Sequence, residues 1–135
     1  MPDTAIARAE HSIHHVHELI QMVFSRPAAE TQAALGGLMA VFAEDFSMVG
    51  IAGTLFHRQQ VEQLFRRIAG TRPGLEIEID EVQVVWLAGM NMAVRYKEVQ
   101  RLQGVTQARW ALAILECSER GVVWRCLQET AVAAN

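Results

Sequence analysis

Apolar positions recur at helical spacing along the first part of the chain. One apolar stripe covers residues 6–24, a second covers residues 27–42, and a third covers residues 58–69. A period of about 3.6 residues indicates amphipathic helices. Pro27 suits the first turn of the second helix, and Gly70 suits the end of the third. We therefore expect three helices, all in the first 70 residues.

The remaining segments have the length and the composition of β-strands. Residues 75–87 begin with Ile77 and Ile79 alternating with acidic side chains, and strand-like runs follow over residues 90–102, 105–117 and 122–132. A shorter run covers residues 46–51. Tight turns separate the four long runs. The order predicts an α+β fold, in which N-terminal helices pack on one face of a strongly curved antiparallel sheet.

Length, composition and charge narrow the class of protein. The chain has 135 residues, which predicts a single domain over residues 1–135. Hydrophobic residues make up 51% of it and charged residues 20%, which excludes a disordered chain. The net charge of -3 argues against binding to nucleic acid. With no long apolar run and no basic leader, we expect a cytoplasmic protein without a membrane segment.

The turns predict which residues face one another across the strands. If Gln103 and Gly104 form a two-residue loop, Glu98 lies directly opposite Arg109. A second loop at residues 119–120 would place Thr130 opposite Arg109. The same register keeps the two cysteines too far apart for a disulfide.

One sheet face therefore combines an apolar floor with polar side chains at one end, as a small-molecule pocket requires. The predicted ligand-binding residues are Tyr96, Glu98, Arg109, Trp124, Gln128 and Thr130. The alternative is that Glu98 and Arg109 form an ion pair that only orients the two strands. Because Arg109 would hold Glu98 ionised, Glu98 suits anchoring of a ligand better than proton transfer.

The opposite face carries too much large apolar surface to remain exposed on a monomer. Its apolar residues include Trp110, Leu112, Ile114 and Leu127. This pattern predicts a homodimer through the outer face of the sheet, and coverage by a loop or a terminus is the alternative.

Candidates for acid/base chemistry are few. Asp45 and His57 flank the short strand pair, and Glu98 is the third candidate. His17 borders the apolar stripe of the first helix, where it would either point into the pocket or, as is more common, lie at the edge of the core. His11, His15 and Glu18 have metal-ligand spacing, but they lie opposite the apolar stripe, so we expect no functional metal. No phosphate-binding loop or nucleophile elbow is present, and we expect no cofactor.

The order of elements resembles the cone-shaped NTF2-like superfamily, including its SnoaL-like and ketosteroid-isomerase-like members. The resemblance covers residues 4–132 and rests on residues 42–46, residues 53–65, Tyr96 with Glu98, Arg109, and residues 124–130. It implies a conical fold with a pocket at the open end, and commonly a dimer packed through the sheets. In this superfamily the last strand often carries a histidine where this chain has Gln128, and the first helix lacks the tyrosine of the isomerases.

Such a fold does not define a reaction. The leading hypothesis is a protein that binds a small, partly apolar molecule inside the cone. The alternative is a SnoaL-like enzyme, an isomerase, cyclase or hydratase with Asp45, His57 or Glu98 as its acid or base. A module that only mediates protein interactions is a third hypothesis.

Overall fold

Helices form most of the first half of the chain, as their apolar stripes predict. The computed structural model describes residues 2–133. Its helices are α1 (Pro2–Ser25), the short 3-10 helix η1 (Ala28–Glu30), α2 (Gln32–Val41) and α3 (Arg58–Ile68). The second predicted helix is thus divided, because a 3-10 turn at residues 28–30 precedes α2. Among the described residues, no helix combines the length and the apolar character that crossing a membrane requires.

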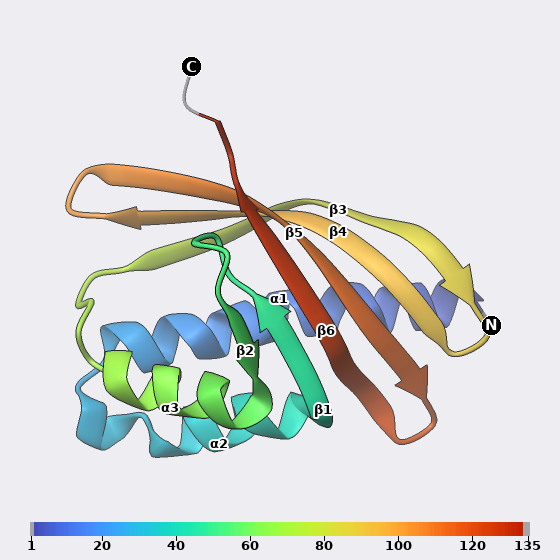
Figure 1. The fold of residues 1–135 in the computed structure, drawn as a ribbon, viewed down its shortest axis with the longest axis horizontal. Coiled ribbons are helices and arrows are strands. Elements are labelled where there is room, and N and C mark those ends of the chain that lie inside the picture. The colour runs from blue at the N-terminus through green and yellow to red at the C-terminus, as the bar shows by residue number, and fades with distance from the viewer. Residues whose placement is uncertain (1, 134–135) are drawn as a thin grey trace.

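Six strands form one curved sheet in the order β2-β1-β6-β5-β4-β3 (Figure 1). The strands are β1 (Phe42–Val49), β2 (Leu55–His57), β3 (Glu76–Ala88), β4 (Asn91–Leu102), β5 (Val105–Ser118) and β6 (Gly121–Ala131). Strands β3 to β6 form the predicted antiparallel meander. The sheet is nevertheless mixed, because β1 pairs with β6 in parallel orientation. The α+β prediction is confirmed, and the parallel pair corrects the expectation of an entirely antiparallel sheet.

The helices pack on the concave side of this sheet, with α1 running behind the strands in Figure 1. Ala9, Ile13, Val16 and Val23 are at most 1% exposed and supply the buried face of α1. They share one core with the inner residues of the sheet, among them Leu115. Burying one such aliphatic side chain stabilises the fold by about 1.5–3 kcal/mol.

The turn between β4 and β5 confirms the first predicted register. Gln103 and Gly104 both have positive φ, at 52° and 78°, as a two-residue hairpin loop of the I′ type requires. Leu102 then pairs with Val105, and Glu98 lies directly opposite Arg109.

The predicted register between β5 and β6 is correct only near the turn. Cys117 pairs with Val122 as predicted, and both cysteines are free thiols. The register shifts between Ile114 and Leu115, because Arg125 is one extra residue in β6. A bulge of this kind moves every later side chain of the strand to the other face.

Beyond the bulge, the predicted pairing of Arg109 with Thr130 is therefore wrong. Arg109 lies opposite Ala131, and Thr130 lies opposite Trp110. Glu129 takes the inward position next to Ala111 that Gln128 was expected to hold.

Candidate functional site

A buried imidazole–carboxylate pair lies between α1 and the sheet. His17 on α1 is 4% exposed, and Glu98 on β4 is 3% exposed. The imidazole Nε2 lies 3.1 Å from Oε1 of Glu98. His17 reaches the sheet because it lies four residues after Ile13, on the buried side of α1.

Both ring nitrogens of His17 face hydrogen-bond acceptors. Nδ1 lies 2.7 Å from the carbonyl oxygen of Ile13, which can only accept a hydrogen bond, so Nδ1 carries a proton. The contact with Glu98 needs a second proton between Nε2 and the carboxylate oxygen. With both ring nitrogens protonated and Glu98 ionised, the two side chains form a buried ion pair.

The other oxygen of Glu98 belongs to a chain of contacts that leads to the surface. Gln100 Nε2 donates to Oε2 of Glu98 at 2.6 Å. Arg72 Nη1 in turn donates to Oε1 of Gln100 at 3.3 Å. Gln100 lies two residues after Glu98 on β4, so both side chains point to the same face of the sheet.

Arg109 pairs with a carboxylate other than the predicted one. Its Nη1 lies 3.5 Å from Oε1 of Glu129 on β6, and its Nη2 donates to Gln107 at 3.2 Å. The side chains of Arg109 and Glu129 are only 13% and 9% exposed. The interior thus holds two carboxylates and two basic side chains, and Glu98 and Arg109 each have a different main partner.

The surroundings of Glu98 hold its pKa at about 2. Burial acts in the opposite direction and would raise that pKa. The hydrogen bond and the charge of His17, the hydrogen bond from Gln100 and the charge of Arg109 together outweigh burial. Glu98 is therefore ionised at neutral pH.

The pKa of Glu129 shifts in the opposite direction from that of Glu98. Burial, followed by the nearby negative charge of Glu98, raises the pKa of Glu129, and Arg109 and His17 only partly oppose this. The pKa of Tyr96 is also raised well above 10, by burial and then by the charges of Glu98 and Glu129. Glu98 and Glu129 therefore differ in acidity although both belong to the same interior cluster.

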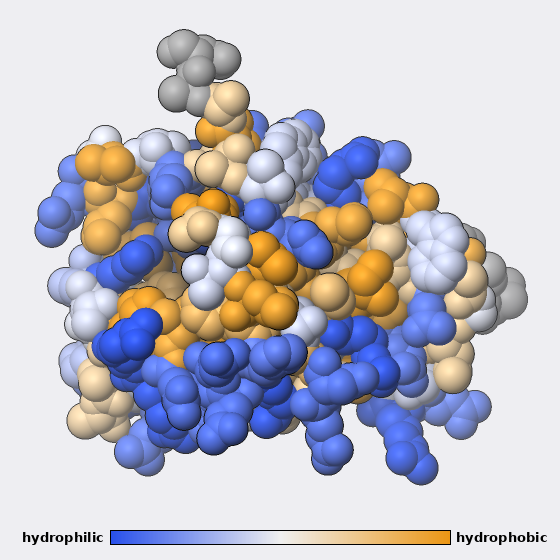
Figure 2. Space-filling model, viewed as in Figure 1, coloured by the Kyte–Doolittle hydropathy of each residue, from blue (hydrophilic) through white to orange (hydrophobic). Residues whose placement is uncertain are grey.

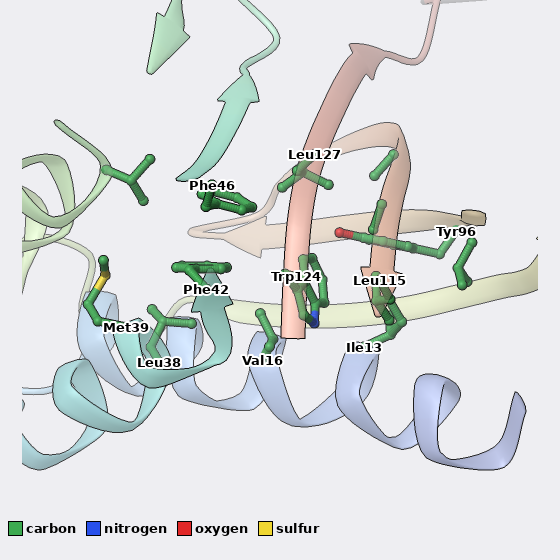
Figure 3. Close-up of a cluster of buried hydrophobic side chains, with 14 of the residues drawn as sticks. Ile13, Val16, Leu38, Met39, Phe42, Phe46, Tyr96, Leu115, Trp124 and Leu127 are labelled. Atoms are coloured by element: carbon green, nitrogen blue, oxygen red, sulfur yellow. The ribbon is translucent and has the colours of Figure 1, made fainter. Parts of the chain in front are cut away.

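Tyr96 and Trp124 lie in the core, on the predicted side of the sheet (Figure 3). Both are 0% exposed. The Trp124 Nε1 group donates to Ser12 at 3.0 Å, and the ring of His17 lies against both aromatic rings. Within the described part of the chain, the buried Tyr96 hydroxyl and Nε of Arg109 have no hydrogen-bond partner.

Two clefts flank this cluster. The first, which we name the α1–β3 cleft, has a volume of about 340 Å³, and its walls include His17, Gln21 and Met22 of α1 and Ile77 and Ile79 of β3. The second, the hairpin cleft, has a volume of about 310 Å³ and lies where the β4–β5 hairpin faces the loop after α3. Neither cleft is lined by Tyr96, Glu98, Arg109 or Trp124.

Several residues expected at the site lie elsewhere. Asp45 is exposed and pairs with Arg125 at 3.0 Å. His57 is also exposed, directly before α3, and its backbone N–H donates to Gln60. Gln128 and Thr130 are exposed on the outer face, because the bulge at Arg125 turns the side chains at the end of β6 to the face opposite the predicted one.

The outer face keeps most of its predicted apolar residues. Figure 2 shows hydrophobic residues gathered over the strands, above a hydrophilic band over α2 and α3. Leu112 is 38% exposed, and Lys97 lies over the ring of Trp110 at 5.8 Å. Leu127 was expected on this face but is 7% exposed in the inner core, again because of the bulge.

The sequence contains a signal for the inward position of Glu129, which the unbroken strand period does not predict. Trp124 and Leu127 are large apolar residues three positions apart, a break in the strand period that indicates a bulge and turns Glu129 inward. His17 borders the apolar stripe and was expected at the edge of the core, but its contact with Glu98 was not predicted. Nothing in the spacing indicates that Arg72 reaches Gln100.

The exposed histidine face of α1 does not form a metal cluster. The rings of His11 and His15 stack with their centroids 6.0 Å apart. Across the residues that the structure describes, no group of three His, Cys, Asp or Glu side chains is arranged to hold a metal ion.

Solved structures identify the family. An NTF2-like protein of unknown function from Pseudomonas aeruginosa is 34% identical in sequence, with a TM-score of 0.85, and the match covers 93% of this chain and 99% of that one. This chain therefore belongs to the NTF2-like family. No protein-family model matches the sequence, and no curated protein matches it either.

Two more distant structures share the fold alone. A dehydratase candidate of the NTF2-like family from Streptomyces avermitilis has a TM-score of 0.80 at 15% identity, covering 99% of this chain and 100% of its own. A scytalone dehydratase candidate from Novosphingobium aromaticivorans has a TM-score of 0.73 at 11% identity, covering 98% of this chain and 89% of its own.

Proposed function

We propose that this NTF2-like protein binds a small, partly apolar molecule in the α1–β3 cleft. The observation that carries the proposal is His17, which lines this cleft and is hydrogen-bonded to the buried Glu98 behind it. Met22, Ile77 and Ile79 supply apolar walls. The polar walls come from His14, Glu18, Gln21, Ser25 and Arg26. A volume of about 340 Å³ is at the lower end of ligand pockets, which suits a small ligand.

Filling the cleft tests this proposal. We expect Met22→Trp to abolish the thermal shifts that hits from a metabolite library give with the wild-type protein, because the larger ring occupies the cleft. Met90→Trp is the matched control, since Met90 is 55% exposed in the turn between β3 and β4 and lies outside this cleft. Ligand-induced shifts that survive in Met22→Trp and equal those of the control would remove the cleft from the site.

An acid/base enzyme is the second candidate, and the opposite pKa shifts of Glu98 and Glu129 favour it. Paired carboxyls whose environments separate their acidities are typical of proton-transfer sites. The directions of the two pKa shifts make Glu129 the better candidate for the proton donor, and Glu98 would remain ionised. The dehydratase candidates among the structural neighbours are compatible with such chemistry. Binding remains the leading proposal because neither Glu98 nor Glu129 lines the α1–β3 cleft or the hairpin cleft.

We also propose a homodimer through the outer sheet face, around Trp110, Leu112 and Ile114. Sedimentation velocity should give twice the monomer mass of 15.1 kDa for the wild-type chain. Trp110→Arg should shift the population to monomer, because a charge would be buried at the interface. Gln63→Arg, at an exposed position of α3 on the helical side, should remain dimeric. A Trp110→Arg protein that sediments like the wild type would exclude this interface.

A further inference from the structure

The hairpin cleft contains a cationic side chain without a charge partner. Arg72 lies in the loop after α3 and lines this cleft with the side chains of Leu75, Leu102 and Val105. The other lining residues are Gln100, Gln103 and Gln107. The cleft therefore has one positive charge, no negative one, apolar walls and three amides.

Arg72 is held in place from several directions. Its backbone N–H donates to the carbonyl oxygen of Phe24 at 2.9 Å, and its guanidinium carbon lies 5.6 Å from the centre of the Phe24 ring. Nη1 donates to Gln100 at 3.3 Å. Because these contacts fix the guanidinium before any ligand arrives, a ligand loses little free energy in ordering it.

The ion pairs within the described part of the chain leave Arg72 free. Arg66, Arg101, Arg109 and Arg125 each have a carboxylate within 4.0 Å, whereas Arg72 has none. Arg109 lies behind the cleft wall, where it donates to Gln107. Because Arg109 is paired with Glu129 and does not line the cleft, Arg72 is the cationic side chain of the cleft lining.

We propose that the hairpin cleft binds a small carboxylate with an apolar tail. The carboxylate would accept hydrogen bonds from the guanidinium of Arg72, and the tail would contact Leu75, Leu102 and Val105. A guanidinium fork matches the two oxygens of a carboxylate. This is a second site, separate from the α1–β3 cleft, and Gln100 joins the two through its contacts with Arg72 and Glu98.

Calorimetric titration with hexanoate and 1-hexanol tests the proposal, because the two probes share a tail and differ in charge. Hexanoate should bind one site, about 10–100-fold more tightly than hexanol, as expected for hydrogen bonds to a charged group. Arg72→Gln should remove this preference. Arg66→Gln, which makes the same charge change on the exposed side of α3, should retain it.

A second variant keeps the test valid if Arg72→Gln folds poorly. Val105 is 68% exposed, so Val105→Asp should fold normally and weaken hexanoate binding by about tenfold through like-charge repulsion. Equal affinities for the two probes, no binding of hexanoate, or unchanged hexanoate binding in Arg72→Gln would each overturn the proposal. The Met22→Trp experiment reports on the other cleft, so the two proposals fail independently.

Discussion

We expect His17→Ala to lower the free energy of unfolding by about 3–5 kcal/mol at neutral pH, the usual effect of removing one member of a buried ion pair. The loss follows because Glu98 would remain 3% exposed without the imidazole that offsets its burial. Chemical denaturation of the wild type and the variant measures it. A loss below about 1 kcal/mol would show that the pair does not support the fold.

The pH dependence separates this effect from a simple packing defect. In the wild type the pKa of Glu98 falls from 4.5 to about 2, so the ionised carboxylate stabilises the fold above pH 4.5. This contribution, about 3 kcal/mol, is lost as the pH falls through the folded-state pKa. In His17→Ala, burial dominates and should raise that pKa, so the destabilisation should be smaller at pH 4 than at pH 7.

A double-mutant cycle isolates the interaction between the two side chains. Glu98→Gln removes the charge and keeps the shape, so His17→Ala should cost less in that background than in the wild type. Equal losses in both backgrounds would mean that the two side chains act independently.

Trp124→Ala should also lower the free energy of unfolding by about 3–5 kcal/mol, as large-to-small substitutions of a buried aromatic do. Trp124 is 0% exposed, its ring contacts Phe42 edge-on, and its Nε1 group donates to Ser12. The substitution leaves a cavity between α1 and β6 and removes the hydrogen-bond partner of a buried hydroxyl.

Trp86→Ala is the matched control for this substitution. Trp86 is 53% exposed on β3, so its removal should change stability by less than about 1 kcal/mol. Urea denaturation of both variants gives the comparison. Similar losses for the two tryptophans would contradict the inner-core position of Trp124.

Most of the fold could be predicted from local patterns in the sequence. The apolar stripes of the helices and the Gln103-Gly104 loop are both local features of the sequence. The loop sufficed to place Glu98 opposite Arg109. The parallel pairing of β1 with β6 could not be inferred in this way. It joins segments far apart in the chain, and no turn defines their relative direction.

The side chains at the site were predicted less well than the fold, because one extra residue in β6 changes which of them face inward. A single extra residue at Arg125 turns Gln128 and Thr130 outward and Glu129 inward. The alternation along a strand predicts which face of the sheet each side chain occupies only as far as that alternation is unbroken. Likewise, the strand register placed Glu98 directly opposite Arg109. It did not indicate that His17 would be the partner of Glu98, or that Glu129 would be the partner of Arg109.

Mapping where a bound metabolite lies tests the central claim, binding in the α1–β3 cleft, most directly. NMR spectra of the labelled protein should be recorded with and without a hit from the thermal-shift screen. We predict that the ring signals of His17 and the methyl signals of Ile77 and Ile79 change on binding, since these side chains line the cleft. Changes confined to Trp110 and Leu112 on the outer face, with the His17 and Ile77 signals unmoved, would contradict it.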